Sequence, residues 1–371
     1  MDIRELLKFA KQQGASDLHL SSGVSPMVRL HGSLRKLDMN PLTREDIHSM
    51  IDNILNDDQR KRFERDLELD FSFNLNGSAR FRANVSQQER GEAAVFRMIP
   101  SGCPTLSQLN LPPIIADLVL KEKGLILVTG PTGSGKTTTL AAMVNHINEN
   151  RHAHLITIED PIEFLHQPKN CLINQRELGK HTHSFAAALK SALREDPDVI
   201  LVGEMRDLET TALAITAAET GHLVMATLHT NSAHKTVDRV VDIFPAESRD
   251  QVRTMFSESI LAIIAQTLIP TKDGKGRVAG FEILVANTAT RNLIREGKTY
   301  QIPSVIQTGQ QSGMQSLDHH LKDLVNKGII TKEEAAKKAT DAKIFAETTL
   351  DRPLEGQGSL RPFQRSASGR A

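Results

Sequence analysis

The sequence predicts two domains of different class, a small α+β domain followed by a larger α/β domain built on a parallel sheet. Three observations predict this organisation. Apolar and polar residues alternate before residue 100, a stretch bearing Pro and Gly follows, and short apolar runs separated by helical segments fill most of the rest. The chain has 371 residues, enough for two domains of about 150 residues each.

The first domain is predicted over residues 1–99 as an α+β module with an antiparallel sheet. Its elements are a helix at Ile3–Ala10, strands at Leu18–Leu20, Met27–Leu30, Phe71–Leu75 and Arg80–Ser86, and a hairpin turn at Asn76–Gly77. The alternation along the last two strands is typical of a sheet with one buried face.

Residues 100–115 are predicted to link the two domains, because prolines at this density disfavour a continuous helix or a central strand. The second domain is predicted over residues 116–345. Its apolar runs are Leu125–Thr129, Leu155–Ile158, Val199–Val202 and Leu223–Thr227. Residues 346–371 contain few apolar side chains and are predicted to be disordered.

Composition argues against two other classes of protein. Lys plus Arg and Asp plus Glu each number 45, so the formal net charge is zero. A general nucleic-acid binder usually has a basic excess, so no nucleic-acid partner is expected. The most apolar runs, Gly124–Gly130 and Ile260–Gln266, are far shorter than the roughly 20 residues that span a bilayer. The first residues also lack a signal-peptide pattern, and a cytoplasmic location is expected.

A phosphate-binding loop follows the first apolar run of the second domain. It matches the pattern G-x-x-x-x-G-K-[ST] between a strand and a helix, which is the context that this motif requires. We expect its backbone N–H groups and the helix N-terminus to hold phosphates, Lys136 to contact the β- and γ-phosphates of ATP, and Thr137 to bind Mg²⁺. The predicted nucleotide-binding residues are Gly130, Pro131, Thr132, Gly133, Ser134, Gly135, Lys136, Thr137 and Thr138.

Acidic residues follow two other predicted strands. Glu204 ends the run Asp198–Glu204 and is expected at the carboxyl edge of the sheet, beside the phosphate loop. We expect Glu204 to bind Mg²⁺. Pro161 ends another strand, and Glu163 after it is a candidate base that orients water; Glu159 is assigned to the metal or to the loop.

Three histidines, His222, His229 and His234, flank a further apolar run. Their spacing matches no familiar zinc site. We assign His229 a catalytic role as a sensor near the γ-phosphate, with a structural hydrogen bond as the alternative.

Through these motifs the chain resembles the ring ATPases of the secretion superfamily, and the resemblance covers residues 1 to about 345. The matching segments are the acidic box Ile158–Phe164, the strand-end glutamate segment Leu201–Asp207, the histidine box Gly221–Arg239, and Ser16–Leu20 with Arg80–Arg82 in the first domain. The resemblance implies a RecA-like P-loop ATPase domain preceded by a smaller PAS-like domain, and a homo-hexamer with ATP between neighbouring subunits. It also implies that arginines of the first domain, namely Arg80, Arg82 or Arg97, approach the phosphates.

Within this superfamily the chain is similar to the branch that retracts type IV pili. Ala289–Glu296 resembles its retraction motif, with Thr290 where isoleucine is usual, and Gly313–Asp318 also resembles this branch. Considered without this resemblance, the segment Ala289–Glu296 is predicted to be an amphipathic helix with a charged face. The two cysteines, Cys103 and Cys171, do not make the four-cysteine zinc motif of pilus-assembly ATPases.

The resemblance implies a hexameric ATPase motor that hydrolyses ATP to retract pili and so drives twitching motility. The implied partners are an inner-membrane pilus platform protein and a paralogous retraction ATPase, and the implied location is the inner face of the cytoplasmic membrane. Two alternatives stay open. One is an accessory paralogue that assists another retraction motor, which intact Glu163 and Glu204 disfavour. The other is a nucleic-acid translocase, which zero net charge, one Tyr and no Trp disfavour.

Overall fold

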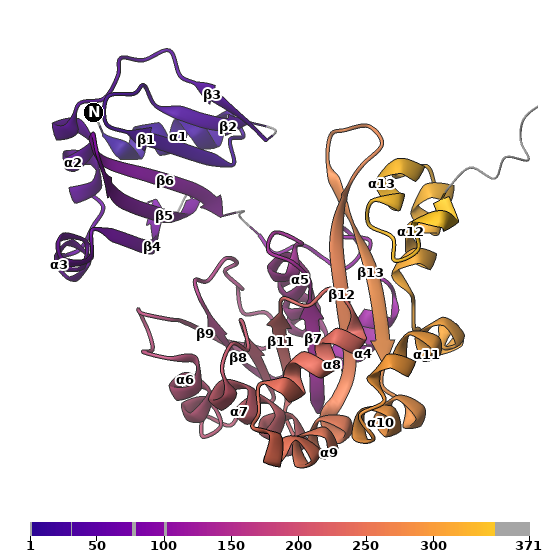
Figure 1. Cartoon of the computed structure of the whole chain (residues 1–371). Helices are drawn as coiled ribbons and strands as arrows, with labels where there is room; N and C mark the ends of the chain where they lie inside the picture. Colours follow the sequence, from indigo (N-terminus) through magenta and orange to yellow (C-terminus); the bar gives the residue numbers. More distant parts are fainter. Residues whose placement is uncertain (1, 31, 76–78, 100–101, 346–371) are drawn as a thin grey trace, which may run out of the picture.

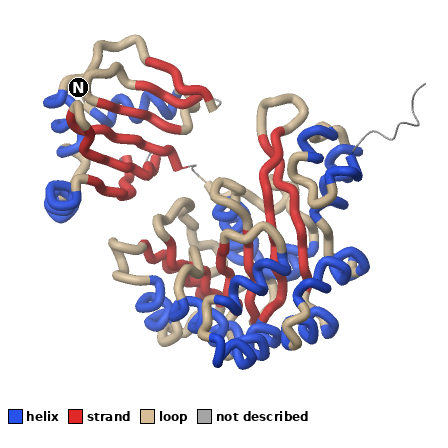
Figure 2. Tube along the Cα trace, in the orientation of Figure 1, coloured by secondary structure: helices blue, strands red, loops and turns tan. Residues whose placement is uncertain are grey.

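The computed structural model describes residues 2–30, 32–75, 79–99 and 102–345. The predicted turn at Asn76–Gly77, the first two residues of the predicted linker and the predicted disordered segment 346–371 lie outside the described residues. The described chain forms two sheets, one before residue 100 and one after it (Figures 1 and 2).

The first sheet has six strands in the order β3-β2-β1-β6-β5-β4, and each neighbouring pair is antiparallel. The elements are α1 (Ile3–Gln12), β1 (Asp17–Ser21), β2 (Met27–Leu30), β3 (Ser33–Lys36), α2 (Arg44–Asp52), α3 (Asp57–Asp66), β4 (Glu68–Leu75), β5 (Ala79–Gln88) and β6 (Gly91–Ile99). Each helix begins at a residue whose side chain accepts a backbone N–H, namely Asp2, Thr43 and Asn56. The predicted antiparallel α+β module is confirmed.

The second sheet has seven strands in the order β13-β12-β7-β11-β10-β8-β9, parallel except for β13. Its strands are β7 (Gly124–Thr129), β8 (His154–Glu159), β9 (Leu172–Glu177), β10 (Val199–Val202), β11 (Leu223–Leu228), β12 (Ile260–Pro270) and β13 (Arg277–Val285). All four apolar runs predicted as strands are strands. Figure 1 shows that the β12–β13 hairpin extends well beyond the other strands.

Helices cover both faces of this sheet (Figure 2). They are α4 (Ile114–Val119), α5 (Lys136–Asn150), α6 (Phe185–Ala192), α7 (Leu208–Glu219), α8 (Ala233–Asp242), α9 (Arg249–Ser259), α10 (Thr288–Arg295), α11 (Ile302–Thr308), α12 (Leu317–Asn326) and α13 (Lys332–Ala336). Short 3-10 helices lie at Ala246–Ser248, Thr299–Gln301, Gln310–Ser312 and Ala342–Phe345. No helix in the described part of the chain is long and apolar enough to cross a membrane.

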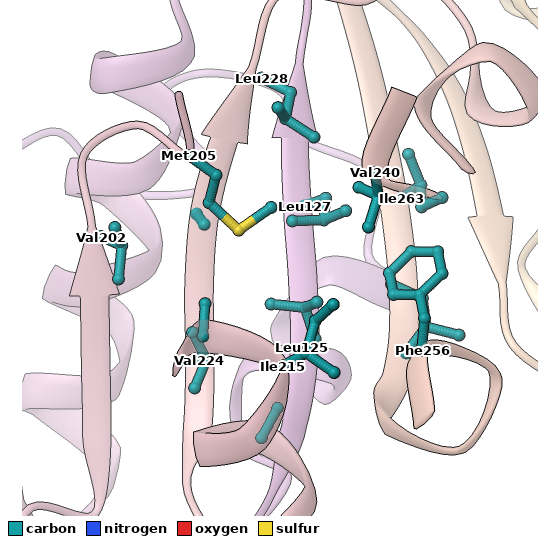
Figure 3. Close-up of a cluster of buried hydrophobic side chains, with 14 of the residues drawn as sticks. Leu125, Leu127, Val202, Met205, Ile215, Val224, Leu228, Val240, Phe256 and Ile263 are labelled. Atoms are coloured by element: carbon teal, nitrogen blue, oxygen red, sulfur yellow. The ribbon is translucent and has the colours of Figure 1, made fainter. Parts of the chain in front are cut away.

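Alternate residues of the central strands point to opposite faces and build two cores. Leu125 and Leu127 pack with α7, α8 and α9 on one face, as Figure 3 shows for Ile215, Val240 and Phe256. Their chain neighbours pack with α4 and α5 on the other face. The central strands are therefore apolar at nearly every position, as expected for a parallel sheet buried on both sides.

The parallel strands direct four segments to one edge of the sheet. The phosphate loop follows β7, residues 160–164 of the acidic box follow β8, Glu204 follows β10 and His229 follows β11. Since ligands of open α/β sheets bind outside the carboxyl ends of the strands, this edge is where a functional site is expected.

Candidate nucleotide-hydrolysis site

The phosphate loop is shaped by glycines and supported from β12. Gly135 has φ +89° and is the N-cap of α5. Gly130 has φ +147°, and a Cβ atom there would lie 2.3 Å from the backbone oxygen of Gln266. The Gln266 side chain donates from Nε2 to the backbone oxygen of Ser134 at 2.6 Å. No local sequence pattern marks Gln266 as a site residue, because only the fold brings β12 under the loop.

A cavity of about 510 Å³ lies over this loop. Its lining includes six of the nine predicted nucleotide-binding residues, namely Thr132, Gly133, Gly135, Lys136, Thr137 and Thr138. Of the other three, Gly130 and Ser134 are buried and Pro131 is exposed. The Lys136 ammonium donates to the backbone oxygens of Gly130 at 2.7 Å and Pro131 at 3.2 Å. Burial lowers the pKa of Lys136, although the nearby charge of Glu204 acts in the opposite direction.

Glu204 lines the cavity, and both of its carboxylate oxygens have partners. Oε1 lies 3.0 Å from Nε2 of His229, and Oε2 lies 2.8 Å from Nη2 of Arg206. Burial would raise the pKa of Glu204, but hydrogen bonds from Arg206 and His229 lower it below the ordinary value. Arg206 was not predicted as a site residue, although it lies in the strand-end glutamate segment Leu201–Asp207.

Ile158 and Glu159 end β8, and the rest of the acidic box forms a loop after the strand, as predicted. Glu159 and Glu163 both line the cavity. Glu159 is almost fully buried, and its Oε1 accepts from Thr157 Oγ1 at 2.7 Å and from Gln175 Nε2 at 3.1 Å. Burial raises the pKa of Glu159 to about 7. Glu163 is partly exposed at the cavity.

The three arginines expected near the phosphates lie in different places. Arg82 and Arg97 line the cavity together with the phosphate loop. Arg97 also donates from Nε to Oδ1 of Asp17 at 2.9 Å. Arg80 does not line the cavity; its Nη2 lies 2.5 Å from Oε2 of Glu177, in β9. Arg277 at the start of β13 lines the cavity too, and no motif in the sequence indicated it.

The three histidines of the histidine box lie in different places. His229 follows β11 at the cavity, whereas His222 precedes it at the opposite edge of the sheet, with Nδ1 2.9 Å from the backbone oxygen of Ala217. His234 lies in α8. His222 and His229 are thus separated by the length of β11.

The residues assigned to the metal offer the oxygen ligands that Mg²⁺ prefers. Thr137 and Glu204 line one cavity, and a hydroxyl–carboxylate pair of this kind holds Mg²⁺ in P-loop enzymes. The donor set fits the ion.

Comparisons with known proteins identify the family. A family described as type II/IV secretion system protein matches residues 1–337. The type IV pilus retraction ATPase PilT of Pseudomonas aeruginosa is 57% identical over 339 residues, which cover 91% of this chain and 98% of that protein. The type IV pilus ATPase PilU of the same bacterium is 40% identical over 363 residues, covering 97% and 95%.

A solved structure has the same fold. The crystal structure of the pilus retraction motor PilT with bound ADP superposes with a TM-score of 0.87 at 47% identity, covering 93% of this chain and 98% of that one. The chain belongs to the type II/IV secretion ATPase family.

Proposed function

We propose that this chain is the ATPase subunit of a motor that retracts type IV pili. The observation that carries the proposal is the convergence of the phosphate loop, Glu163, Glu204 and His229 on one cavity, in a chain 57% identical to a pilus retraction ATPase. Identity to PilU of the same bacterium is lower, at 40%, which favours the motor over the accessory paralogue.

The cavity supports ATP hydrolysis in the following way. The loop from Gly130 to Thr138 binds the phosphates through backbone N–H groups and the N-terminus of α5, with Lys136 neutralising negative charge. Thr137 and Glu204 hold Mg²⁺, which when bound neutralises charge on the phosphate oxygens. Glu163 orients a water molecule for attack on the γ-phosphorus.

The positions of the other polar groups suggest how hydrolysis is sensed. His229 and Arg206 both contact Glu204, so a change in charge at the γ-phosphate would be transmitted to them. Arg82 and Arg97 bring positive charge from the first sheet to the cavity. We propose that they respond to the nucleotide, so that residues 1–99 move relative to residues 116–345 about the segment 100–115.

The assembled form is proposed from the family resemblance of the sequence. Subunits form a homo-hexamer at the inner face of the cytoplasmic membrane and act on a pilus platform protein there. In cells, this activity would appear as pilus retraction and twitching motility.

Steady-state ATPase activity of the full chain tests this function. The wild type is expected to hydrolyse ATP without DNA, whereas Glu163→Gln and Glu204→Ala lose on the order of 100-fold in kcat while keeping the assembly state of the wild type by light scattering. Hydrolysis only in the presence of DNA would favour the translocase instead. Retraction by this chain in cells that lack every paralogous ATPase separates a motor from an accessory subunit.

A further inference from the structure

Strand β9 holds the loop that carries Glu163. Gln175 donates from Nε2 to the backbone oxygen of Phe164 at 2.9 Å and accepts from the backbone N–H of His166, also at 2.9 Å. Two residues further along the strand, Oε2 of Glu177 accepts from the backbone N–H of Ile162 at 3.2 Å. The N–H of the residue before Glu163 and the carbonyl of the residue after it are therefore hydrogen-bonded to side chains of β9.

The same Glu177 carboxylate binds the first sheet. Its Oε1 accepts from the hydroxyl of Ser72 in β4 at 2.8 Å, and its Oε2 lies 2.5 Å from Nη2 of Arg80 in β5. That Arg80 nitrogen also donates to the Ser72 hydroxyl at 2.8 Å. Figure 1 shows β9 at the edge of the second sheet, below β4 and β5 of the first.

This contact is buried, unlike most ion pairs of the molecule. The Arg80 and Glu177 side chains are 9% and 6% exposed. The side chains of the Arg82–Asp70 pair, which joins β5 to β4, are 40% and 62% exposed. A buried charge that loses its partner is strongly unfavourable. If the first domain moves away, the Glu177 carboxylate must therefore rearrange or become hydrated. The Ile162 N–H binds the same carboxylate oxygen as Arg80, Oε2, so this hydrogen bond would be affected as well.

We propose that Glu177 is a positioning residue that couples docking of the first domain to the placement of Glu163. With Arg80 docked, the carboxylate is oriented to hold the Ile162 N–H and the Glu163 loop is ordered. With Arg80 withdrawn, that hydrogen bond weakens and Glu163 is less well placed. Arg80 thus acts on hydrolysis through Glu177 and not by contact with the phosphates. The inference rests on the proposed role of Glu163 and assigns a trigger for it.

The test uses the full chain and four variants. Arg80→Met and Glu177→Gln each remove one charge of the pair, and the double variant removes both, so that no unpaired charge stays buried. Arg176→Met is the matched control, because Arg176 is the β9 neighbour of Glu177 and pairs at 3.4 Å with Glu195, within the second domain. For each variant, kcat, KM, thermal midpoint and backbone hydrogen exchange of a peptide covering residues 160–166 are measured.

The expected result is a loss of about tenfold in kcat for Arg80→Met and for Glu177→Gln, with KM changed less than twofold, because misplacement of a catalytic group lowers the rate after binding. The double variant should recover thermal stability relative to the singles without recovering kcat, and its loss should stay near tenfold. Exchange over residues 160–166 should rise in all three, and Arg176→Met should match the wild type in kcat and exchange.

Other results would overturn the inference. Additive losses near 100-fold in the double variant would mean that Arg80 and Glu177 act independently, as they would if Arg80 contacted phosphate. Recovery of kcat together with stability would mean that the pair is only structural. Unchanged exchange over residues 160–166 would also contradict the coupling. Glu163→Gln, measured in parallel, separates the two claims: if it hydrolyses ATP normally, the proposed function of Glu163 fails, while hydrogen exchange still reports on the contact itself.

Discussion

Nε2 of His229 lies 3.0 Å from Oε1 of Glu204, so the ends of strands β10 and β11 are joined by side chains directly beside the phosphate loop. The other oxygen of Glu204 is paired with Arg206. A carboxylate held by two donors has a defined orientation, and the identity of those donors influences both its position and its acidity.

Replacing His229 by Ala is expected to lower kcat about tenfold, because Glu204 loses one of the two donors that orient it. Burial acts to raise the pKa of Glu204, and the hydrogen bonds from Arg206 and His229 oppose it. Without His229 that pKa should rise in the metal-free protein, and a titration of the Glu204 carboxylate in the absence of Mg²⁺ measures the change. His319→Ala, which removes an exposed histidine 3.7 Å from Asp323, is the control. An unchanged kcat, or an unmoved pKa, would contradict this account.

Replacing Gly130 by Ala is expected to abolish nucleotide binding. Its φ of +147° is strained for Ala, and the new Cβ would meet the Gln266 backbone oxygen at 2.3 Å. Titration with a fluorescent ADP analogue measures the loss. Gly274→Ala is the control, since it also has a positive φ, +67°, but nothing lies within 4 Å of its Cβ. Normal binding by Gly130→Ala would show that the loop does not need this close approach.

Replacing Gln266 by Leu is expected to raise KM for ATP several-fold with a smaller effect on kcat. The Ser134 carbonyl loses its donor at 2.6 Å, and an unsatisfied buried carbonyl costs about 1–3 kcal/mol. The loop should then spend less time in the phosphate-binding conformation. Steady-state kinetics over a range of ATP concentrations decides the point, and equal losses in kcat and kcat/KM would place Gln266 in the chemical step instead.

Replacing Glu159 by Gln is expected to stabilise the protein more at pH 8 than at pH 5. Burial raises the pKa of Glu159 from the ordinary 4.5 to about 7, so the folded state binds this proton more tightly than the unfolded state. The resulting stability is fully present below about pH 4.5 and is lost as the pH rises through about 7. Gln does not titrate. Thermal midpoints across this range test the prediction, with exposed Glu122→Gln as the control; a pH-independent difference would refute it.

Replacing Thr290 by Val is expected to destabilise the protein by about 1 kcal/mol. Thr290 is buried and completes a capping box: its hydroxyl accepts from the backbone N–H of Asn287 at 2.8 Å, and the Asn287 side chain accepts from the Thr290 N–H at 2.9 Å. The hydroxyl thus has a structural use at the position where isoleucine is usual in the resembled motif. Thermal unfolding measures the cost, and Thr288→Val, exposed in the first turn of the same helix, should be nearly neutral.

Several features of the site could be predicted from local sequence alone. The phosphate loop needs glycine conformations, a lysine and a hydroxyl in a short segment, so its pattern is complete between Gly130 and Thr138. The apolar runs that become β7, β8, β10 and β11 are buried on both faces and are recognisable without knowledge of their neighbours. Glu163, Glu204 and His229 follow three of these runs, and the parallel arrangement brings them to one edge.

Other features depended on contacts between distant segments. Strand β9 was not predicted because it is a polar edge strand, with Leu172 59% exposed. Arg277, Arg206 and Gln266 carry no local pattern that marks them as site residues. The sequence suggested three arginines for the phosphates, but only the tertiary structure showed that two line the cavity and that Arg80 is paired with Glu177.

The sequence by itself determined the class of each domain, the nucleotide motif and the acids at the strand ends, because these depend on residue types within a few positions of one another. Only the tertiary structure decided which side chains support the phosphate loop and what holds Glu163 in place. Ser72 and Glu177 are separated by 105 residues, and no periodicity or spacing encodes such a pair. Whether a charged side chain faces a ligand or a buried partner is decided by the packing of one sheet against the other.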